Sequence, residues 1–110
     1  MVSASNLWGR VQEEFRSVSE RTRRGAERAV RAGVLQVDLV SLRRDRNRAH
    51  AILGERVLAL WSEEKLHTVS EDPEALRLRA LVQTVEESIA AKEEELRTIR
   101  ARASEAVSGH

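Results

Sequence analysis

Apolar residues recur along the chain at helical spacing, and the period of recurrence changes near Val34. Before that point the spacings repeat as four, four and three, which corresponds to about 3.67 residues per turn. From Leu35 onward threes and fours alternate, as in the heptads of a coiled coil. The pattern therefore predicts a long first helix, with residues 1–34 as an amphipathic N-terminal arm that continues into a coiled-coil-like helix over residues 35–65. The members of the first stripe are Leu7, Val11, Phe15, Val18, Thr22, Ala26, Ala29, Gly33, Val37 and Val40.

A short break at residues 66–72 interrupts the helical pattern, and it is followed by Pro73, the only proline of the chain. Asp72 is well suited to cap a helix, because its carboxylate accepts hydrogen bonds from free amides of the first turn, where proline is also favoured. A second helix is expected over residues 73–107, with apolar residues at spacings of four and three. The sequence thus predicts an all-α protein in which residues 35–107 form an antiparallel helical hairpin.

The seam between the two helices is predicted from the heptad positions. In the first helix it comprises Leu35, Leu39, Leu42, Leu53, Val57 and Leu60, and in the second helix Leu78, Val82, Val85, Ile89, Leu96 and Ile99. Two cations, Arg46 and Lys92, also occupy seam positions, and a turn centred near residue 69 places them at the same level. Their stems can cover the seam while their charged ends reach Asp45, Glu95 or water. The alternatives are a polar layer that fixes register or oligomeric state and, less favoured, a bound anion.

Further apolar residues are expected to lie beside the seam and to widen the apolar face beyond what one partner helix can cover. They are Val34, Val37, Val40, Ile52, Leu58 and Trp61. A hairpin of two helices in a chain of 110 residues also encloses little core of its own. We therefore expect two or more hairpins to associate into a helical bundle, as a homodimer or tetramer.

The N-terminal arm admits two interpretations. Its candidate contact face consists of Leu7, Trp8, Val11, Phe15 and Val18. The small residues that follow would let a partner helix approach closely, which favours an oligomerisation segment. Alternatively, the large apolar residues insert into an anionic membrane surface while neighbouring arginines meet lipid phosphates. Acidic residues dilute the positive charge of the arm, and this favours the first interpretation.

Charge is distributed unevenly, although the net charge is only +1. Residues 1–50 contain eleven arginines and six acidic residues, whereas residues 51–110 contain eight basic and twelve acidic residues. Either the halves neutralise each other on folding or the basic half binds an anion, for which Arg43, Arg44 and Arg48 are the candidates. Nucleic acid is disfavoured, because consecutive helical residues turn by about 100° and no aromatic side chain lies nearby to stack on bases.

Residues able to perform chemistry are sparse. The chain has no cysteine, and its three histidines are far apart. Glu64 and His67 have the i, i+3 spacing of a ligand pair in di-iron helical bundles, but the pair is solitary, and the sequence leaves open whether it binds metal. We therefore expect neither enzymatic activity nor a cofactor. The lack of an apolar run of about 20 residues and of a recognisable signal peptide predicts a cytoplasmic protein.

Together these features predict a non-enzymatic, self-associating coiled-coil scaffold or adaptor that binds partner proteins through its helical surface. The alternative is a peripheral membrane protein that acts through the N-terminal arm. The identity of a protein partner does not follow from these patterns.

Overall fold

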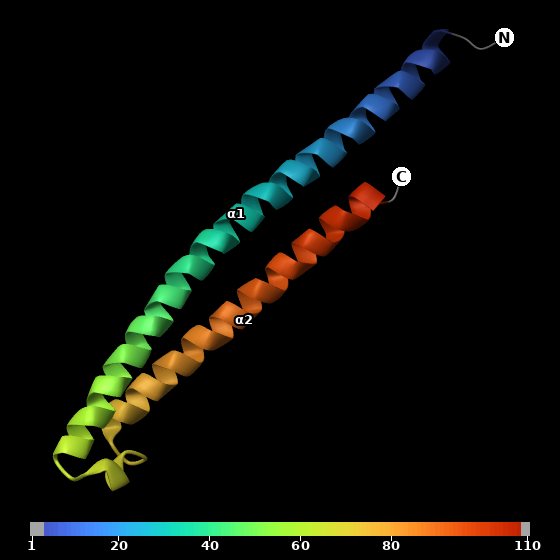
Figure 1. Cartoon of the computed structure of the whole chain (residues 1–110). Coiled ribbons are helices and arrows are strands. Elements are labelled where there is room, and N and C mark those ends of the chain that lie inside the picture. Colours follow the sequence, from blue (N-terminus) through green and yellow to red (C-terminus); the bar gives the residue numbers. More distant parts are fainter. Residues whose placement is uncertain (1–3, 109–110) are drawn as a thin grey trace.

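The structure is a computed structural model and describes residues 4–108. These residues form two long helices joined by a short turn (Figure 1). Helix α1 spans Ala4–Ser62, the short 3-10 helix η1 spans Leu66–Thr68, and helix α2 spans Pro73–Ser108. The two long helices lie side by side in opposite directions, and the molecule measures 94 × 19 × 18 Å. The predicted all-α antiparallel hairpin is thus confirmed.

The seam of the hairpin is apolar and follows the heptad positions of both helices. Leu35 and Leu78 are the most completely enclosed side chains, with 0% and 2% of their surface exposed. A core cluster of Leu35, Leu39, Ile89 and Leu96 lies in the half of the seam farther from the turn, where Leu42, Val85 and Ile99 pack against it. Leu60, Ala75 and Leu78 are buried near the turn. Burial of these side chains, at about 25 cal/mol per Å² of apolar surface, holds the helices together.

Helix α1 ends at Ser62, three residues earlier than the sequence pattern suggested, because a Schellman motif terminates it. The amide of Lys65 donates to the carbonyl of Leu60 at 2.7 Å, and the amide of Glu64 donates to the carbonyl of Trp61 at 3.0 Å. This arrangement requires a left-handed residue, and Glu64 adopts a φ of 61°. A glutamate therefore occupies a position at which glycine is normally favoured.

Replacing Glu64 by glycine is expected to stabilise the hairpin by about 1 kcal/mol, because glycine adopts the left-handed conformation without the penalty that a Cβ atom imposes. The neighbouring Glu63 does not have a positive φ, so Glu63→Gly provides the matched control and should not stabilise. Urea unfolding followed by circular dichroism measures both changes. An equal effect of the two substitutions would show that the left-handed backbone at Glu64 carries no strain.

Helix α2 begins with the Asp72 cap, which is also tied to α1. One carboxylate oxygen, Oδ2, accepts a hydrogen bond from the amide of Ala75 at 2.9 Å. The guanidinium of Arg56 donates to both carboxylate oxygens, at 2.9 Å and 2.6 Å. The sequence predicted the cap but not Arg56, whose role depends on where α2 begins relative to α1.

The ion pair makes stability depend on pH in a defined direction. Hydrogen bonds from Arg56, together with the Ala75 amide, lower the pKa of Asp72 from 3.8 to about 2. Because the folded-state pKa lies below the unfolded-state value, ionised Asp72 stabilises the fold fully above the unfolded pKa of about 4, and this contribution is lost as the pH falls through about 2. Asp72→Asn keeps an acceptor for the Ala75 amide but removes the charge.

We expect Asp72→Asn to be less stable than the unmodified chain at neutral pH, and the difference to shrink as the pH falls from about 4 to about 2. Urea midpoints measured for both proteins across this range test the prediction. The comparison at each pH cancels the contribution of the other carboxylates. A difference that stays constant down to about pH 2 would contradict the assignment.

The turn is asymmetric, and this changes the register of the helices. Because Arg56 binds Asp72, α2 begins beside Arg56, and the last turn and a half of α1 extends past it toward η1. A symmetric turn centred near residue 69 would instead pair Arg56 with a residue near 82. Cross-helix partners therefore lie nearer the start of α2 than expected, and Lys92 meets Asp38 at 3.3 Å, two turns away from the level of Arg46.

Candidate functional site

The outward face of α1 carries a second apolar stripe, opposite the seam. Each helical residue turns by about 100°, so Val37 points away from α2 when Leu35 and Leu39 point toward it. Val37 is 70% exposed, and Val34 and Val40 are also exposed. Val37 and Val40, which were expected to lie beside the seam, instead continue the eleven-residue pattern of the arm onto the outer face.

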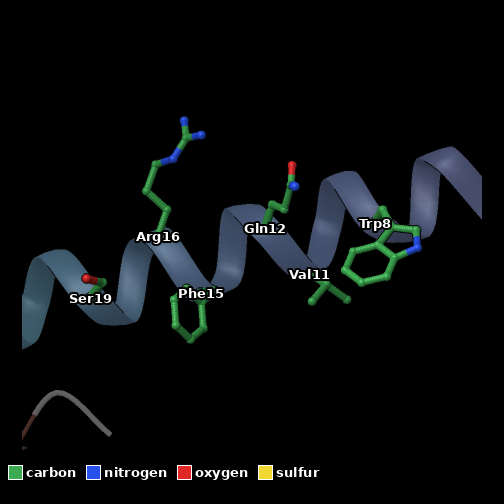
Figure 2. A pocket seen from close by; sticks show the side chains of 6 residues that line it. All are labelled: Trp8, Val11, Gln12, Phe15, Arg16 and Ser19. Carbon is green, nitrogen blue, oxygen red and sulfur yellow. The ribbon is translucent and has the colours of Figure 1, made fainter.

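The N-terminal part of this stripe projects beyond the hairpin. All residues from Trp8 to Glu27 are exposed, and the beginning of α1 extends past the end of α2 (Figure 1). Figure 2 shows Val11 and Phe15 on one side of the helix and Gln12 and Arg16 on the other. Phe15 is 76% exposed. Leu7, the remaining predicted member of this face, belongs to α1, but its side chain lies outside the described part of the structure.

Val30 extends the apolar surface and was not among the predicted contact residues. It lines a shallow groove with Ala26 and Val34, flanked by Arg23, Glu27 and Arg31. The signal in the sequence was the spacing of Val30, Val34 and Val37, which was masked by the weaker alanines and glycine of the main stripe. We call the exposed residues the outer stripe; they are Trp8, Val11, Phe15, Val18, Val30, Val34, Val37 and Val40.

No side chain of the hairpin covers the middle of the outer face. A Cβ atom built at Gly25 or at Gly33 would meet nothing within 4 Å, so neither glycine is required by packing within the chain. Thr22 and Ala29, which lie on the same face, are exposed. The weak centre of the stripe therefore leaves room for another helix to approach.

The predicted seam residues lie between the helices, where Leu35, Leu39, Leu60, Leu78, Ile89 and Leu96 are buried. Leu42, Leu53, Val57, Val82, Val85 and Ile99 are half-buried. Arg46 and Lys92 are also half-buried, but the structure does not bring them together, since Lys92 donates to Asp38. Arg46 and Lys92 therefore do not form the shared polar layer that a symmetric turn would have produced.

Ion pairs across the seam account for part of the charge asymmetry. Arg31 donates two hydrogen bonds to Glu95, at 2.8 Å and 3.0 Å, and this lowers the pKa of Glu95. Arg43 meets Glu93 at 3.3 Å, and His50 lies 3.7 Å from Glu86. These contacts are solvent-exposed, so they favour this register more than they stabilise the fold.

The predicted anion contacts do not converge on one site. Arg43 is engaged by Glu93, whereas Arg44 and Arg48 are exposed. Because Arg44 and Arg48 are four residues apart and Arg43 precedes Arg44, the three guanidinium groups leave α1 in two directions. This arrangement provides no cradle for a phosphate.

A separate group of exposed apolar residues surrounds the turn and includes Ile52, Leu58, Trp61 and Leu66. Arg44, Asn47 and Arg48 separate this group from the outer stripe along α1.

Within residues 4–108 no three His, Asp or Glu side chains are grouped so that they could hold a metal ion, and Glu64 and His67 therefore lack further ligands there. Neither helix contains a described segment that is long and apolar enough to cross a membrane.

The candidate functional site is thus a surface, the outer stripe, and it contains no assembled group of reactive side chains among the described residues. Comparison of the chain with protein-family models, with curated proteins and with solved structures found no match.

Proposed function

We propose that this protein is a non-enzymatic assembly protein, a helical hairpin that associates with other copies of itself and with partner proteins through its helical surface. The observation that carries the proposal is the outer stripe, an apolar surface on the face of α1 opposite the hairpin seam. The seam already satisfies the hairpin, so the outer stripe is free to serve a second contact.

Two physical arguments support association through this surface. Monomeric proteins rarely expose contiguous apolar patches of more than a few hundred Å², and the outer stripe includes the large side chains of Trp8 and Phe15. In addition, every residue of the arm from Trp8 to Glu27 is exposed, so little of this segment is packed against the rest of the chain. A helical segment without packing is only marginally stable in water, so a partner that covers the stripe would also stabilise the arm.

The same exposed residues also suit the alternative function, which is binding to an anionic membrane surface. Trp8 and Phe15 would enter the interface, and Arg10 and Arg16 would meet lipid phosphates. Glu13 and Glu14 lie on the same stretch and would oppose this binding. Assembly is therefore the function that we favour.

Circular dichroism of the full chain with and without anionic phospholipid vesicles, combined with light scattering of the lipid-free sample, separates the two functions. An assembly protein should be fully helical and oligomeric before lipid is added, and vesicles should leave its helix content unchanged. A monomer whose arm is unfolded without lipid and becomes helical when vesicles are added would instead identify a membrane-binding protein.

A further inference from the structure

We propose that two copies of the chain pair through their outer stripes as an antiparallel dimer whose two-fold axis passes near Thr22. This inference rests on the proposed function and specifies the partner, the surface and the orientation. The two hairpins would then lie at opposite ends of the dimer, with the arms overlapping between them.

Val11, Phe15 and Val18 of the outer stripe belong to the eleven-residue pattern of α1, and the spacing of that pattern is the same in both directions from Thr22. The next members lie four residues away at Val18 and Ala26, seven away at Phe15 and Ala29, and eleven away at Val11 and Gly33. An antiparallel two-fold operation at Thr22 therefore superimposes one stripe on the other without a slip. An eleven-residue period keeps this stripe almost straight along the helix, so the match extends over the whole overlap.

Side-chain sizes are complementary in this pairing. Each large residue on the N-terminal side of Thr22 meets a small one of the second copy: Phe15 opposes Ala29, Val11 opposes Gly33, and Val18 opposes Ala26. Trp8 lies level with the stretch between Val34 and Val37 of the second copy. In a parallel dimer in register, Phe15 would oppose Phe15 and Gly33 would oppose Gly33, so the helices would splay at one end and leave gaps at the other. Close packing favours the antiparallel arrangement.

The polar group at the centre of the stripe suits the same arrangement. The hydroxyl of Thr22 donates to the carbonyl of Val18 at 2.9 Å within its own helix, so burial at the two-fold axis leaves no unpaired donor. Arg21 opposes this arrangement, because its guanidinium approaches that of Arg21 in the second copy near the two-fold axis.

The hairpin does not obstruct this dimer. Helix α2 covers the face of α1 that bears Leu35 and Leu39, and the outer stripe lies on the other side. The Arg31–Glu95 contact remains in place, since both residues belong to the hairpin side. The overlap of the two arms buries two copies each of Trp8 and Phe15, aromatic residues that dominate interface energetics.

Single cysteines test the orientation, since the natural chain has none. Thr22→Cys places two thiols at the axis, where oxidation should link the copies. Ala29→Cys, a matched control on the same stripe, places them about 21 Å apart along the axis at 1.5 Å per residue, beyond the separation of about 7 Å that a disulfide permits. We expect at least about tenfold more linked dimer for Thr22→Cys. A mixture of Val18→Cys and Ala26→Cys proteins should form the mixed disulfide in preference to either homodimer.

Each other outcome overturns the inference in a distinguishable way. Efficient linkage of Ala29→Cys as well as Thr22→Cys would indicate a parallel dimer. Linkage of neither, in a sample that light scattering shows to be dimeric, would place the dimer contact on another face and leave the proposed function intact. A monomer at all concentrations would overturn both the inference and the proposed function.

Discussion

Replacing Leu78 by alanine is expected to lower the free energy of unfolding by about 3 kcal/mol. Leu78 is 2% exposed and lies on the seam near the turn, where Leu60 and Ala75 are also buried. Truncation removes buried apolar surface and leaves a cavity that two regular helices cannot close without distortion. Chemical unfolding at fixed protein concentration, followed by circular dichroism, measures the change.

Leu76→Ala is the matched control for this prediction. Leu76 lies two residues earlier in the same helix but is 42% exposed, so the same truncation should cost less than about 1 kcal/mol. Similar losses for the two variants would contradict the assignment of Leu78 to the seam and of Leu76 to the surface.

Replacing Phe15 by aspartate is expected to weaken self-association by about a hundredfold or more. The substitution removes an aromatic side chain from both copies in a dimer and introduces two carboxylates into the apolar contact. Helix α2 does not cover Phe15, so the hairpin should keep its stability. Sedimentation equilibrium measures the dissociation constant, and unfolding of the isolated monomer measures the hairpin.

The control for Phe15→Asp is Val107→Asp. Val107 is 79% exposed and lies near the end of α2, away from the outer stripe. A substitution of the same kind there should leave the dissociation constant unchanged. Equal weakening by both variants would point to a general effect of added negative charge, and unchanged association of Phe15→Asp would remove the outer stripe as the contact surface.

Much of the hairpin was predictable because periodicity, capping and turn chemistry agree. The heptad leucines from Leu35 to Leu60 identified the seam of α1, and Asp72 with Pro73 identified the first turn of α2. The register was predicted in part: Arg43 meets Glu93 and His50 lies near Glu86, as a turn centred near residue 69 implies. The pairing of Lys92 with Asp38 and of Arg56 with Asp72 was not predicted, because the length of the turn does not reveal how its backbone is arranged.

The outer stripe was visible in the sequence, but its direction was not. The eleven-residue pattern and the heptad pattern overlap between Gly33 and Val40, and periodicity alone does not tell which of two apolar faces a second helix will cover. The cross-helix contacts decide this, since Leu35 and Leu39 have partners on α2 and Val37 does not. Val30 was missed for a related reason, because it lies beside the regular stripe.

The measurement that tests the central claim most directly is light scattering coupled to size exclusion on the unmodified full chain, from micromolar to hundred-micromolar concentration and at low and high salt, with circular dichroism on the same samples. Association through an apolar stripe predicts a highly helical dimer that persists at high salt. A monomer at every concentration, with helix content that accounts for the hairpin alone, would contradict it.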